Sequence, residues 1–267
     1  MVAGALLTSS EIRRVILDRA HAANEGHIGS ALSIADIMVV LYRDVVAGRL
    51  HGATRDRVVL SKGHAALALY AALYLSGELS EAMLNEYCED GGRLGVHPQH
   101  GIDGVEFTTG SLGQGLSFAT GCALAAQVSG EQWRTFVICS DAECDEGSTW
   151  EAAMFAAQRR LPRLVTVIDY NQQQAMGDTD AVISLGDLRS RWEAVGWFAV
   201  DVDGHDETSL EAALRLADQG RTQPIAVIAH TTFGKGVPFM ERQLRWHYSS
   251  MSDQEYVRAI NSLGAAT

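Results

Sequence analysis

Short apolar segments alternate with longer helical segments along most of the chain. Five short runs carry β-branched or apolar residues on both faces, which is typical of strands buried within a parallel sheet. These runs are Arg57–Leu60, Thr135–Cys139, Leu164–Ile168, Phe198–Val202 and Ile225–Ala229. Because helical segments separate them, the alternation predicts an α/β domain of three layers, with a mostly parallel sheet covered by helices on both sides.

The helical segments are recognised by their periodicity and by their end signals. The first is expected from about Ser9 to Asn24, where Thr8 and Glu11 form a capping box and Gly26 ends the helix. A helix at about 64–76 is closed by Gly77. Further helices are expected at about 33–46, 113–129, 149–159, 188–195, 209–219 and 252–262. No repeat, low-complexity tract or Pro/Ser-rich linker divides the chain, so a single domain over residues 1–267 is predicted.

Composition narrows the class of protein. The 267 residues include 21 Lys+Arg and 33 Asp+Glu, a formal net charge of −12, and 47% are apolar. A packed core is therefore expected, and an acidic surface without a dense basic run argues against nucleic acid as a partner. Apolar stretches such as Ala65 to Leu75 are too short to span a bilayer. Met1 to Leu7 lacks the features of a signal peptide, so a cytoplasmic location is predicted.

The four cysteines fit this prediction. None of them forms a C-x-x-C pair, and two fall in segments that are predicted as a core helix and a core strand. They are Cys88, Cys122, Cys139 and Cys144. We expect them to be small buried hydrophobic residues rather than ligands or redox groups.

Candidate chemistry concentrates after two of the predicted strands. Asp141 follows Thr135–Cys139 in a loop with four carboxylates, and Asn171 follows Leu164–Ile168. Ligands of open parallel sheets bind beyond the carboxyl ends of the strands, and the two strands are expected to be neighbours. Carboxylate and amide oxygens are the ligands that Mg²⁺ prefers, so a magnesium site is one interpretation. The alternative is that the acids only complement the dipole of the following helix.

Six segments, in this order, resemble the N-terminal, diphosphate-binding half of transketolase in the split form, where two chains make the enzyme. They are GHIGSALSIADIMVVLY, SKGHAALALYAAL, VEFTTGSLGQGL, ECDEGSTWEAAMFAA, DYN and TTFGKGVPFM with the later Trp246 and His247. The resemblance runs from the first helix to about Tyr256. It implies an enzyme that uses thiamine diphosphate and Mg²⁺, with Ca²⁺ or Mn²⁺ as substitutes, to transfer a two-carbon ketol unit from a ketose to an aldose or a more specialised acceptor.

The resemblance also implies roles for individual residues. The metal ligands would be Asp141, Asn171 and the backbone carbonyl of Gln173. The cofactor would be held by His64, Gly110, Ser111, Leu112, the backbone amide of Ala142, and His247. The catalytic channel would be lined by His27, His97 and His247, since imidazole can move protons to and from substrate oxygens near neutral pH. Two carboxylates, Glu146 and Glu151, match positions near the subunit contact of the family, or else are solvated.

The other histidines are expected to be local hydrogen-bonding groups. They are His21, His51, His100, His205 and His230.

Three parts of the chain depart from the family pattern. The usual Gly-Asp-Gly is replaced by Ser140, Asp141 and Ala142. Retained cofactor binding is expected if Ala142 keeps a negative φ, whereas a turn that needs a positive φ would cost about 1 kcal/mol. Ile28 stands where proline is common, and Gln172–Gln174 follow the metal asparagine, so both could alter the mouth of the substrate site.

A second chain is expected to complete the enzyme. In this family the glutamate that activates the cofactor belongs to the pyrimidine-binding domain, and no counterpart is found before the chain stops. The resemblance therefore implies a partner subunit that carries the pyrimidine-binding and C-terminal domains, in an α2β2 assembly. Two alternatives remain open, which are condensation chemistry like that of 1-deoxyxylulose-5-phosphate synthase, and a non-catalytic half that has lost the cofactor.

Overall fold

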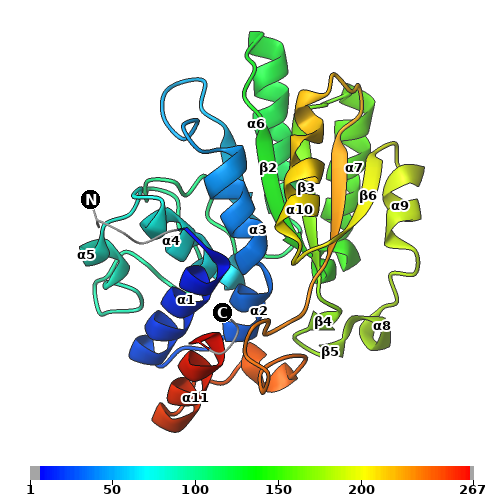
Figure 1. Ribbon diagram of the computed structural model, residues 1–267. Coiled ribbons are helices and arrows are strands. Elements are labelled where there is room, and N and C mark those ends of the chain that lie inside the picture. Colours follow the sequence, from blue (N-terminus) through cyan, green and yellow to red (C-terminus); the bar gives the residue numbers. More distant parts are fainter. Residues whose placement is uncertain (1–6, 265–267) are drawn as a thin grey trace.

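A five-stranded parallel sheet forms the centre of the molecule (Figure 1). The computed structural model describes residues 7–264, so most of the segment tested for a signal peptide and the last residues of the predicted domain lie outside it. The strands are β1 (Arg57–Leu60), β2 (Thr135–Ser140), β3 (Leu164–Tyr170), β6 (Phe198–Asp203) and β7 (Ile225–His230). Their order is β1-β2-β3-β7-β6, and all neighbouring pairs are parallel. The predicted parallel α/β fold is confirmed.

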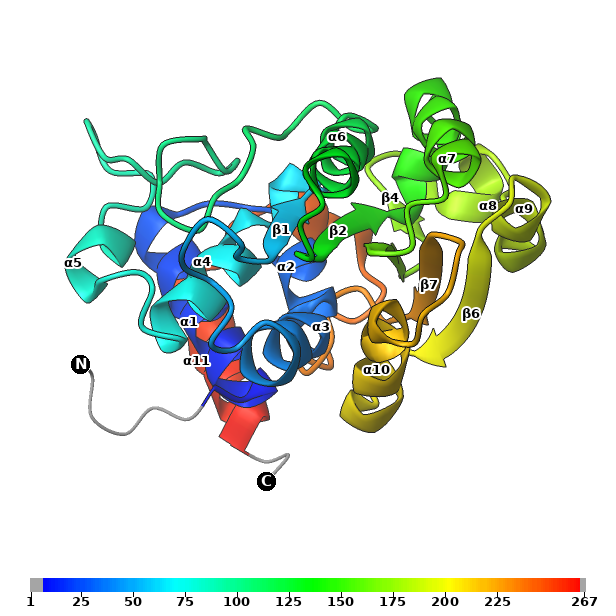
Figure 2. The same ribbon diagram turned by 90° about the horizontal axis from the view of Figure 1, so that it is seen from above.

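Helices cover both faces of the sheet, as the alternation predicts (Figure 2). One face is covered by α3 (Ala35–Val39), the π-helical turn η1 (Val40–Val45) and α10 (Glu207–Leu214), and the other by α6 (Gly115–Ser129), α7 (Gly147–Arg159) and α9 (Leu188–Ala194). Successive residues of a strand point to opposite faces. Phe136 and Ile138 of β2 therefore pack in the first core, whereas Val137 and Cys139 pack in the second.

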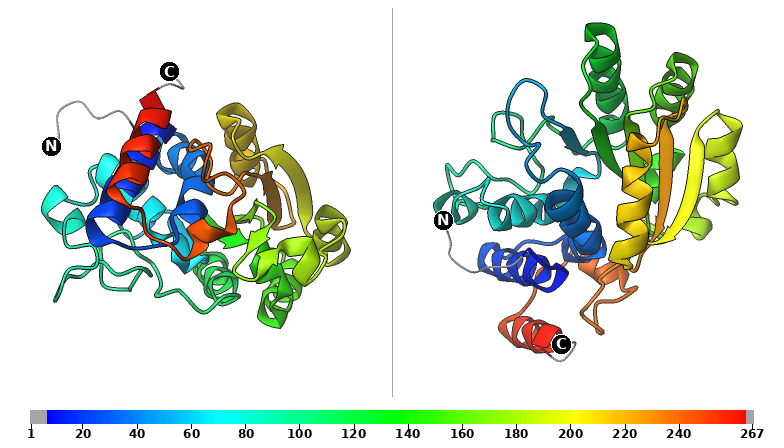
Figure 3. Two further views of the ribbon diagram at one scale, coloured as in Figure 1. Left: turned by 90° about the horizontal axis from the view of Figure 1, so that it is seen from below. Right: turned by 45° about the horizontal axis from the view of Figure 1, so that its top comes forward.

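A further group of helices extends the molecule beside the first face. It consists of α1 (Ser9–Ala23), α2 (Ile28–Ser33), α4 (Ala66–Leu75), α5 (Glu81–Leu84) and α11 (Asp253–Gly264). Helices α1 and α11 lie side by side although they come from opposite ends of the chain (Figure 3). The short elements that complete the fold are η2 (Gly63–Ala65), η3 (Asp141–Asp145), β4 (Gln173–Gln174), β5 (Gly177–Asp178), α8 (Thr179–Val182), η4 (Arg215–Asp218) and η5 (Leu244–His247).

Several predicted boundaries were wrong for local reasons. Helix α1 (Ser9–Ala23) has the predicted extent to within one residue, but it is capped by Asn24, which adopts the left-handed conformation (φ 54°) that asparagine tolerates, and not by Gly26. Gly26 instead lies against the backbone of Tyr248, whose carbonyl oxygen would be 2.5 Å from a Cβ at that position. The helix predicted at 33–46 begins at Ile28 and is divided at Ile34 into α2 and α3.

Strand ends and edges also differ from the prediction. Four strands continue one or two residues into polar positions because the ladder of backbone hydrogen bonds does not depend on side-chain polarity. The strand predicted at Phe198–Val202 is not buried on both faces, since β6 is an edge strand with Asp201 and Asp203 exposed. Of the thiols, Cys139 and Cys144 are buried, Cys122 is partly buried and Cys88 is exposed. Within residues 7–264, no helix combines the length and apolarity that a membrane span requires.

Candidate functional site

The carboxyl ends of β2 and β3 bring Asp141 and Asn171 to the same edge of the sheet. The two strands are paired up to Ser140 and Asp169, so the residues that follow lie next to each other. The backbone amide of Gln172 donates to Asp141 Oδ2 at 2.9 Å, which joins the two loops directly. The side chains of Asp141 and Asn171 are both buried. Asn171 Oδ1 accepts from the backbone amide of Gln173 at 2.9 Å, so an amide oxygen and a carboxylate both lie just beyond the strand ends.

Hydrogen bonds hold the Asp141 carboxylate in place, and its surroundings disfavour its negative charge. Besides Gln172, it accepts hydrogen bonds from the backbone amide of Ala142 and from Thr179 Oγ1, both at 2.8 Å. Burial, and then the negative charge of Asp169, raise the pKa of Asp141 to about 7. A cation beside this carboxylate would favour its charged form. The site therefore suits a bound metal ion.

The backbone around Asp141 does not require the glycines that are absent. Ser140 is extended (φ −88°), and Ala142 lies in η3 and is not among the non-glycine residues with positive φ. The strained alternative for the Ser140–Ala142 turn is thus ruled out. In this arrangement the Ala142 amide donates to the side chain of Asp141.

Asp169 and Lys62 form a buried ion pair beneath the site, and the sequence reasoning missed both residues. Neither side chain is exposed, and the Lys62 Nζ donates to Asp169. Asp169 also accepts from Ser33 Oγ at 2.7 Å and from Asn171 Nδ2 at 2.8 Å, as well as from Thr231 Oγ1. Because the amide nitrogen of Asn171 is bound to this carboxylate, its Oδ1 is turned away from Asp169. The D-x-N spacing was the only sequence signal for Asp169.

Four of the nine histidines converge near this edge of the sheet. The ring centroid of His27 lies 5.8 Å from that of His64 and 6.2 Å from that of His97. His247 lies 5.3 Å from His27 and stacks on His64 at 5.4 Å. They come from four segments, namely the residue before α2 (His27), η2 (His64), the loop after α5 (His97) and η5 (His247). The four histidines that the resemblance singles out are therefore brought together.

The environment of this histidine cluster favours neutral imidazoles. Burial is the largest cause that lowers the pKa of His27, His64 and His247, and the last reaches about 4. Neighbouring positive charge adds to the effect, chiefly His97 for His27, Lys62 for His64 and His27 for His247. The Nδ1 atoms of His27 and His247 are buried without a hydrogen-bond partner in the part of the chain that the structure describes. Such atoms are usually satisfied, so they indicate a ligand.

The segment Gly110, Ser111 and Leu112 lies against the histidine cluster. Gly110 has φ 147°, and a Cβ there would be 3.0 Å from Cδ2 of the His97 ring. Ser111 is exposed and Leu112 is half-buried. Upstream, Thr109 Oγ1 donates to the carbonyl of Leu60 at 2.7 Å, which ties the loop to the end of β1.

Glu143 holds three segments of the site together, and its role was not foreseen. This fully buried carboxylate accepts from the backbone amides of Gly113 and Ser140, each at 2.9 Å, and from the hydroxyl of Ser61. These donors belong to the loop after Gly110–Leu112, the end of β2 and the end of β1. In the sequence, Glu143 was one of four carboxylates in its loop, and the local signal that could have distinguished it is its S-x-x-E spacing from Ser140, with which it forms a capping box.

The remaining candidate residues are Gln173, Glu146 and Glu151. Gln173 is in β4, and its amide nitrogen contacts Asp178 and the carbonyl of Arg242, while its Oε1 is buried without a partner within residues 7–264. Glu146 and Glu151 are exposed at the start of α7 and along it.

Four of the five histidines that were expected to form local hydrogen bonds do so through their rings. His21, His51 and His230 pair with Asp253, Glu78 and Asp201, and His205 pairs with Asp36 and accepts from the amide of Thr232. His100 is exposed, and its backbone amide donates to Thr108.

The donor set decides which ion and ligand fit. Among the described residues, no three His, Cys, Asp or Glu side chains gather in a way that could hold a metal alone. An ion at Asp141 would have this carboxylate, the oxygen of Asn171 and a backbone carbonyl, with further oxygens from a bound ligand. This is how Mg²⁺ is commonly held beside phosphates. The residues present fit a metal-bound diphosphate.

Comparison with known proteins identifies relatives of similar length. The family described as transketolase, thiamine diphosphate binding domain, matches residues 6–266. One of the subunits of the apulose-4-phosphate transketolase from Phocaeicola vulgatus is 36% identical, over 96% of this chain and 92% of the relative. The 6-deoxy-6-sulfo-D-fructose transketolase subunit SqwG of Clostridium sp. is 37% identical, over 94% and 93%.

Solved transketolase structures share the fold over part of their length. The enzyme from Campylobacter jejuni superimposes with a TM-score of 0.88 at 30% identity, over 99% of this chain and 43% of that one. The enzyme from Leishmania mexicana gives 0.88 at 28% identity, over 96% and 40%. The chain thus spans about two fifths of these longer proteins.

Proposed function

Because the chain belongs to the transketolase family as its thiamine diphosphate binding domain, we propose that it is the diphosphate-binding subunit of a split transketolase. It acts as a transferase that moves a two-carbon ketol unit from a ketose donor to an aldose or a more specialised acceptor. The subunits of split transketolases from Phocaeicola vulgatus and Clostridium sp. match it over more than nine tenths of both chains, which supports this assignment. The observation that carries the proposal is the histidine cluster, which is linked to Asn171 because Lys62, close to His64, pairs with Asp169 and Asp169 accepts from the Asn171 amide.

The chain holds the diphosphate end of the cofactor in this proposal. Asp141, Asn171 and the carbonyl of Gln173 bind Mg²⁺, or Ca²⁺ or Mn²⁺ in its place. The phosphates are contacted by His64, the segment Gly110–Leu112 and the Ala142 amide, which must leave the Asp141 side chain to do so. When bound, thiamine diphosphate supplies a nucleophilic carbon on its thiazolium ring.

The histidine cluster offers hydrogen-bond donors and acceptors to the substrate. A neutral imidazole can accept a hydrogen bond at one nitrogen and donate one at the other. His27 and His247 each have a buried Nδ1 without a partner among the described residues, so these atoms are available to substrate hydroxyl or carbonyl oxygens. His97, which packs on Gly110, completes the channel. Depressed pKa values keep His27 and His247 neutral at pH 7, in the form that takes up a proton.

A partner subunit completes the active site. The single domain of this chain holds the diphosphate and the metal, and the pyrimidine-binding and C-terminal domains, with the activating glutamate, reside on the partner in an α2β2 assembly in the cytoplasm. Large apolar side chains near the site support a partner there, since Met176 and Tyr248 are 76% and 62% exposed. Glu146 and Glu151 are exposed and available to the same contact.

The alternative of a non-catalytic half has lost its main motivation. It was suggested by Ser140 and Ala142 in place of glycines, and neither residue is strained. Burial also raises the pKa of Asp141 to about 7, and a bound cation would restore its charged form.

Calorimetric titration of the two-subunit complex with thiamine diphosphate and Mg²⁺ tests the proposal. We expect saturable heat from the unaltered complex and loss of both heat and ketol transfer in Asp141→Ala. The matched control Asp90→Ala, at an exposed position, should bind and react normally. Absence of heat from the unaltered complex, or full activity of Asp141→Ala, would refute the proposal.

A further inference from the structure

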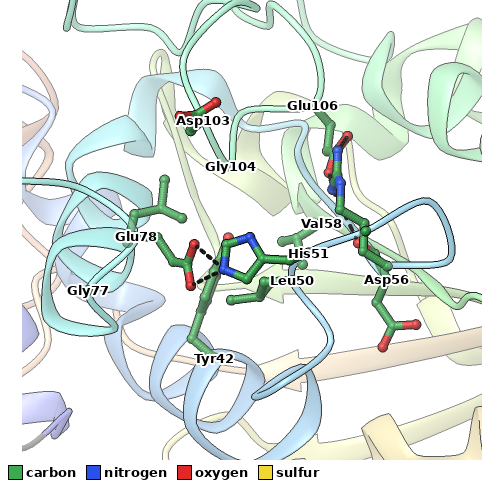
Figure 4. A pocket seen from close by; sticks show the side chains of 13 residues that line it. Tyr42, Leu50, His51, Asp56, Val58, Gly77, Glu78, Asp103, Gly104 and Glu106 are labelled. Atoms are coloured by element: carbon green, nitrogen blue, oxygen red, sulfur yellow. Dashed lines mark hydrogen bonds and ion pairs between the residues drawn. The ribbon is translucent and has the colours of Figure 1, made fainter.

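Most charged residues that line the cavity of about 460 Å³ beside Tyr42 are paired with one another (Figure 4). His51 pairs with Glu78, and Arg55 pairs with Glu106. These side chains therefore satisfy each other and favour no class of ligand. The β4–β5 hairpin, by contrast, lies next to the candidate metal ligands and joins two parts of the site.

The β4–β5 hairpin is too short to keep its shape by itself. Each of its strands contains two residues, and an isolated two-stranded hairpin is at best marginally stable in water. Met176 in its turn is 76% exposed, so the turn packs against little. The hairpin nevertheless begins just after Asn171 and carries Gln173, whose backbone carbonyl is proposed above as a metal ligand. Contacts with neighbouring segments must therefore hold that carbonyl in place.

The backbone hydrogen bonds of the hairpin determine where the Gln173 carbonyl points. The amide of Thr179 donates to the carbonyl of Gln172 at 3.0 Å across the base of the hairpin. Hydrogen-bonded and non-hydrogen-bonded pairs alternate along an antiparallel ladder, so the next pair, Gln173 and Asp178, is of the second kind. The Gln173 amide instead donates to Asn171 Oδ1 at 2.9 Å. Because the amide and carbonyl of a strand residue point to the same side, the Gln173 carbonyl is directed away from β5, to the side on which Asn171 lies.

Gln174 ties the hairpin to η3, the turn that begins with Asp141. It is 6% exposed, and its Nε2 donates to Asp145 Oδ2 at 2.8 Å. The other carboxylate oxygen of Asp145 is buried without a partner within residues 7–264. Gln174 thus provides a buried hydrogen bond between the two segments that carry Asp141 and the Gln173 carbonyl.

Two contacts tie the other side of the hairpin to the segment around η5. Successive side chains of a strand point to opposite sides, and the Nε2 of Gln173 donates to the carbonyl of Arg242 at 3.2 Å. The hydroxyl of Tyr248 donates to the carbonyl of Ala175. The hairpin is therefore held from both sides, by η3 and by the segment around η5.

A ligand that is held firmly affects which cation a site prefers. Mg²⁺ is small and requires nearly octahedral ligands, whereas Ca²⁺ is larger and tolerates variable numbers and positions of oxygen ligands. Movement of one ligand therefore weakens Mg²⁺ binding more than Ca²⁺ binding. We propose that the hairpin, held in this way, raises the selectivity of the metal site for Mg²⁺ over Ca²⁺, with Gln174 as a positioning residue for the Gln173 carbonyl. This inference rests on the proposed function, since it requires that the site holds a metal-bound diphosphate.

Calorimetric titration of the two-subunit complex with Mg²⁺ or Ca²⁺, at saturating thiamine diphosphate, measures the selectivity. Gln174→Met keeps the length of the side chain and removes its hydrogen-bond donor. We expect this variant to bind Mg²⁺ about tenfold more weakly and Ca²⁺ at most about threefold more weakly. Gln219→Met, the same change at an exposed position, should leave both affinities unaltered.

Two further variants separate positioning from a general loss of stability. Gln174→Glu combined with Asp145→Asn exchanges the donor and the acceptor at unchanged total charge, so the ratio of the two affinities should return to that of the unaltered complex. Tyr248→Phe removes only the hydroxyl on the other side of the hairpin and should shift the ratio in the same direction as Gln174→Met, by a smaller factor.

The outcomes distinguish this inference from the proposed function. An unaltered ratio of Mg²⁺ to Ca²⁺ affinity in both Gln174→Met and Tyr248→Phe would overturn the inference, as would a failure of the exchanged pair to restore the ratio. In either case the unaltered complex still binds cofactor and metal, and the proposed function stands. Absence of heat from the unaltered complex with both metals would refute the proposed function itself, and the inference with it.

Discussion

Removal of the Glu143 side chain is expected to loosen the cofactor side of the molecule. This carboxylate accepts from the backbone amides of Gly113 and Ser140, and it also accepts from the Ser61 hydroxyl. In Glu143→Ala all three donors lose their partner inside the protein. The end of β1, the end of β2 and the loop after Gly110–Leu112 are then no longer tied to each other.

The magnitude follows from the number of donors left without an acceptor. Each buried unsatisfied group costs about 1–3 kcal/mol, and the Ser61 hydroxyl can rotate to another acceptor, so the two amides dominate. Glu143→Ala should therefore lower the free energy of unfolding by about 4 kcal/mol, or the melting temperature by about 10 °C. Glu143→Gln keeps one oxygen and should lose about half as much. The matched surface change Glu89→Gln should stay within about 0.5 kcal/mol of the unaltered chain.

Urea unfolding of the three variants, followed by tryptophan fluorescence, measures these differences. Calorimetry of the two-subunit complex then measures the affinity for thiamine diphosphate. We expect it to be lower in Glu143→Gln than in the unaltered complex, and lowest in Glu143→Ala. A Glu143→Ala chain as stable as Glu89→Gln would show that water replaces the carboxylate and that the reasoning is wrong. Reduced stability with unaltered cofactor affinity would refute the link to the Gly110–Leu112 segment.

Three further predictions concern buried groups around the site. Asp169→Asn leaves the ammonium of Lys62 buried without its counter-charge, so we expect a loss of about 3–5 kcal/mol in denaturant unfolding, and a loss below 1 kcal/mol would contradict it. The pKa of His247 is about 4 in the folded chain and near 6.5 when unfolded, so the unfolded state binds the proton first. Stability should then be full above pH 6.5 and fall by about 3 kcal/mol as pH drops to 4, a slope that His247→Gln should flatten in unfolding measured across this range. Gly29→Ala would place a methyl group 2.1 Å from Cε1 of Phe233, and the melting temperature should drop by several degrees, whereas an unchanged value would mean that the ring moves freely.

Much of the fold could be predicted because its signals are local. The strands are recognisable from apolar residues on both faces, and their alternation with helices leaves few arrangements other than a covered parallel sheet. The position of Asp141 and Asn171 could be expected for the same reason, since both follow strands that are consecutive in the chain and pair with each other. Helix ends were less certain, because Asn24 can take the left-handed conformation expected of Gly26.

Contacts between distant residues could not be predicted in this way. The Lys62–Asp169 pair joins positions 107 residues apart, and Ser61 reaches Glu143 across 82 residues. In the sequence, Lys62 is a charged residue in a Gly-rich segment and Glu143 is one acid among several. Their importance arises from burial, which removes water as the alternative partner and makes each hydrogen bond necessary.

The sequence by itself determined the element types, the layer arrangement and, through ordered motifs, the family and the candidate cofactor residues. Backbone propensity and side-chain periodicity act within a few residues, so they can be recognised along the chain. The strand order β1-β2-β3-β7-β6 and the meeting of four histidines were decided only by the tertiary structure. These features depend on which surfaces are buried against each other, and the free energy of that burial belongs to the whole packed molecule rather than to any segment of it.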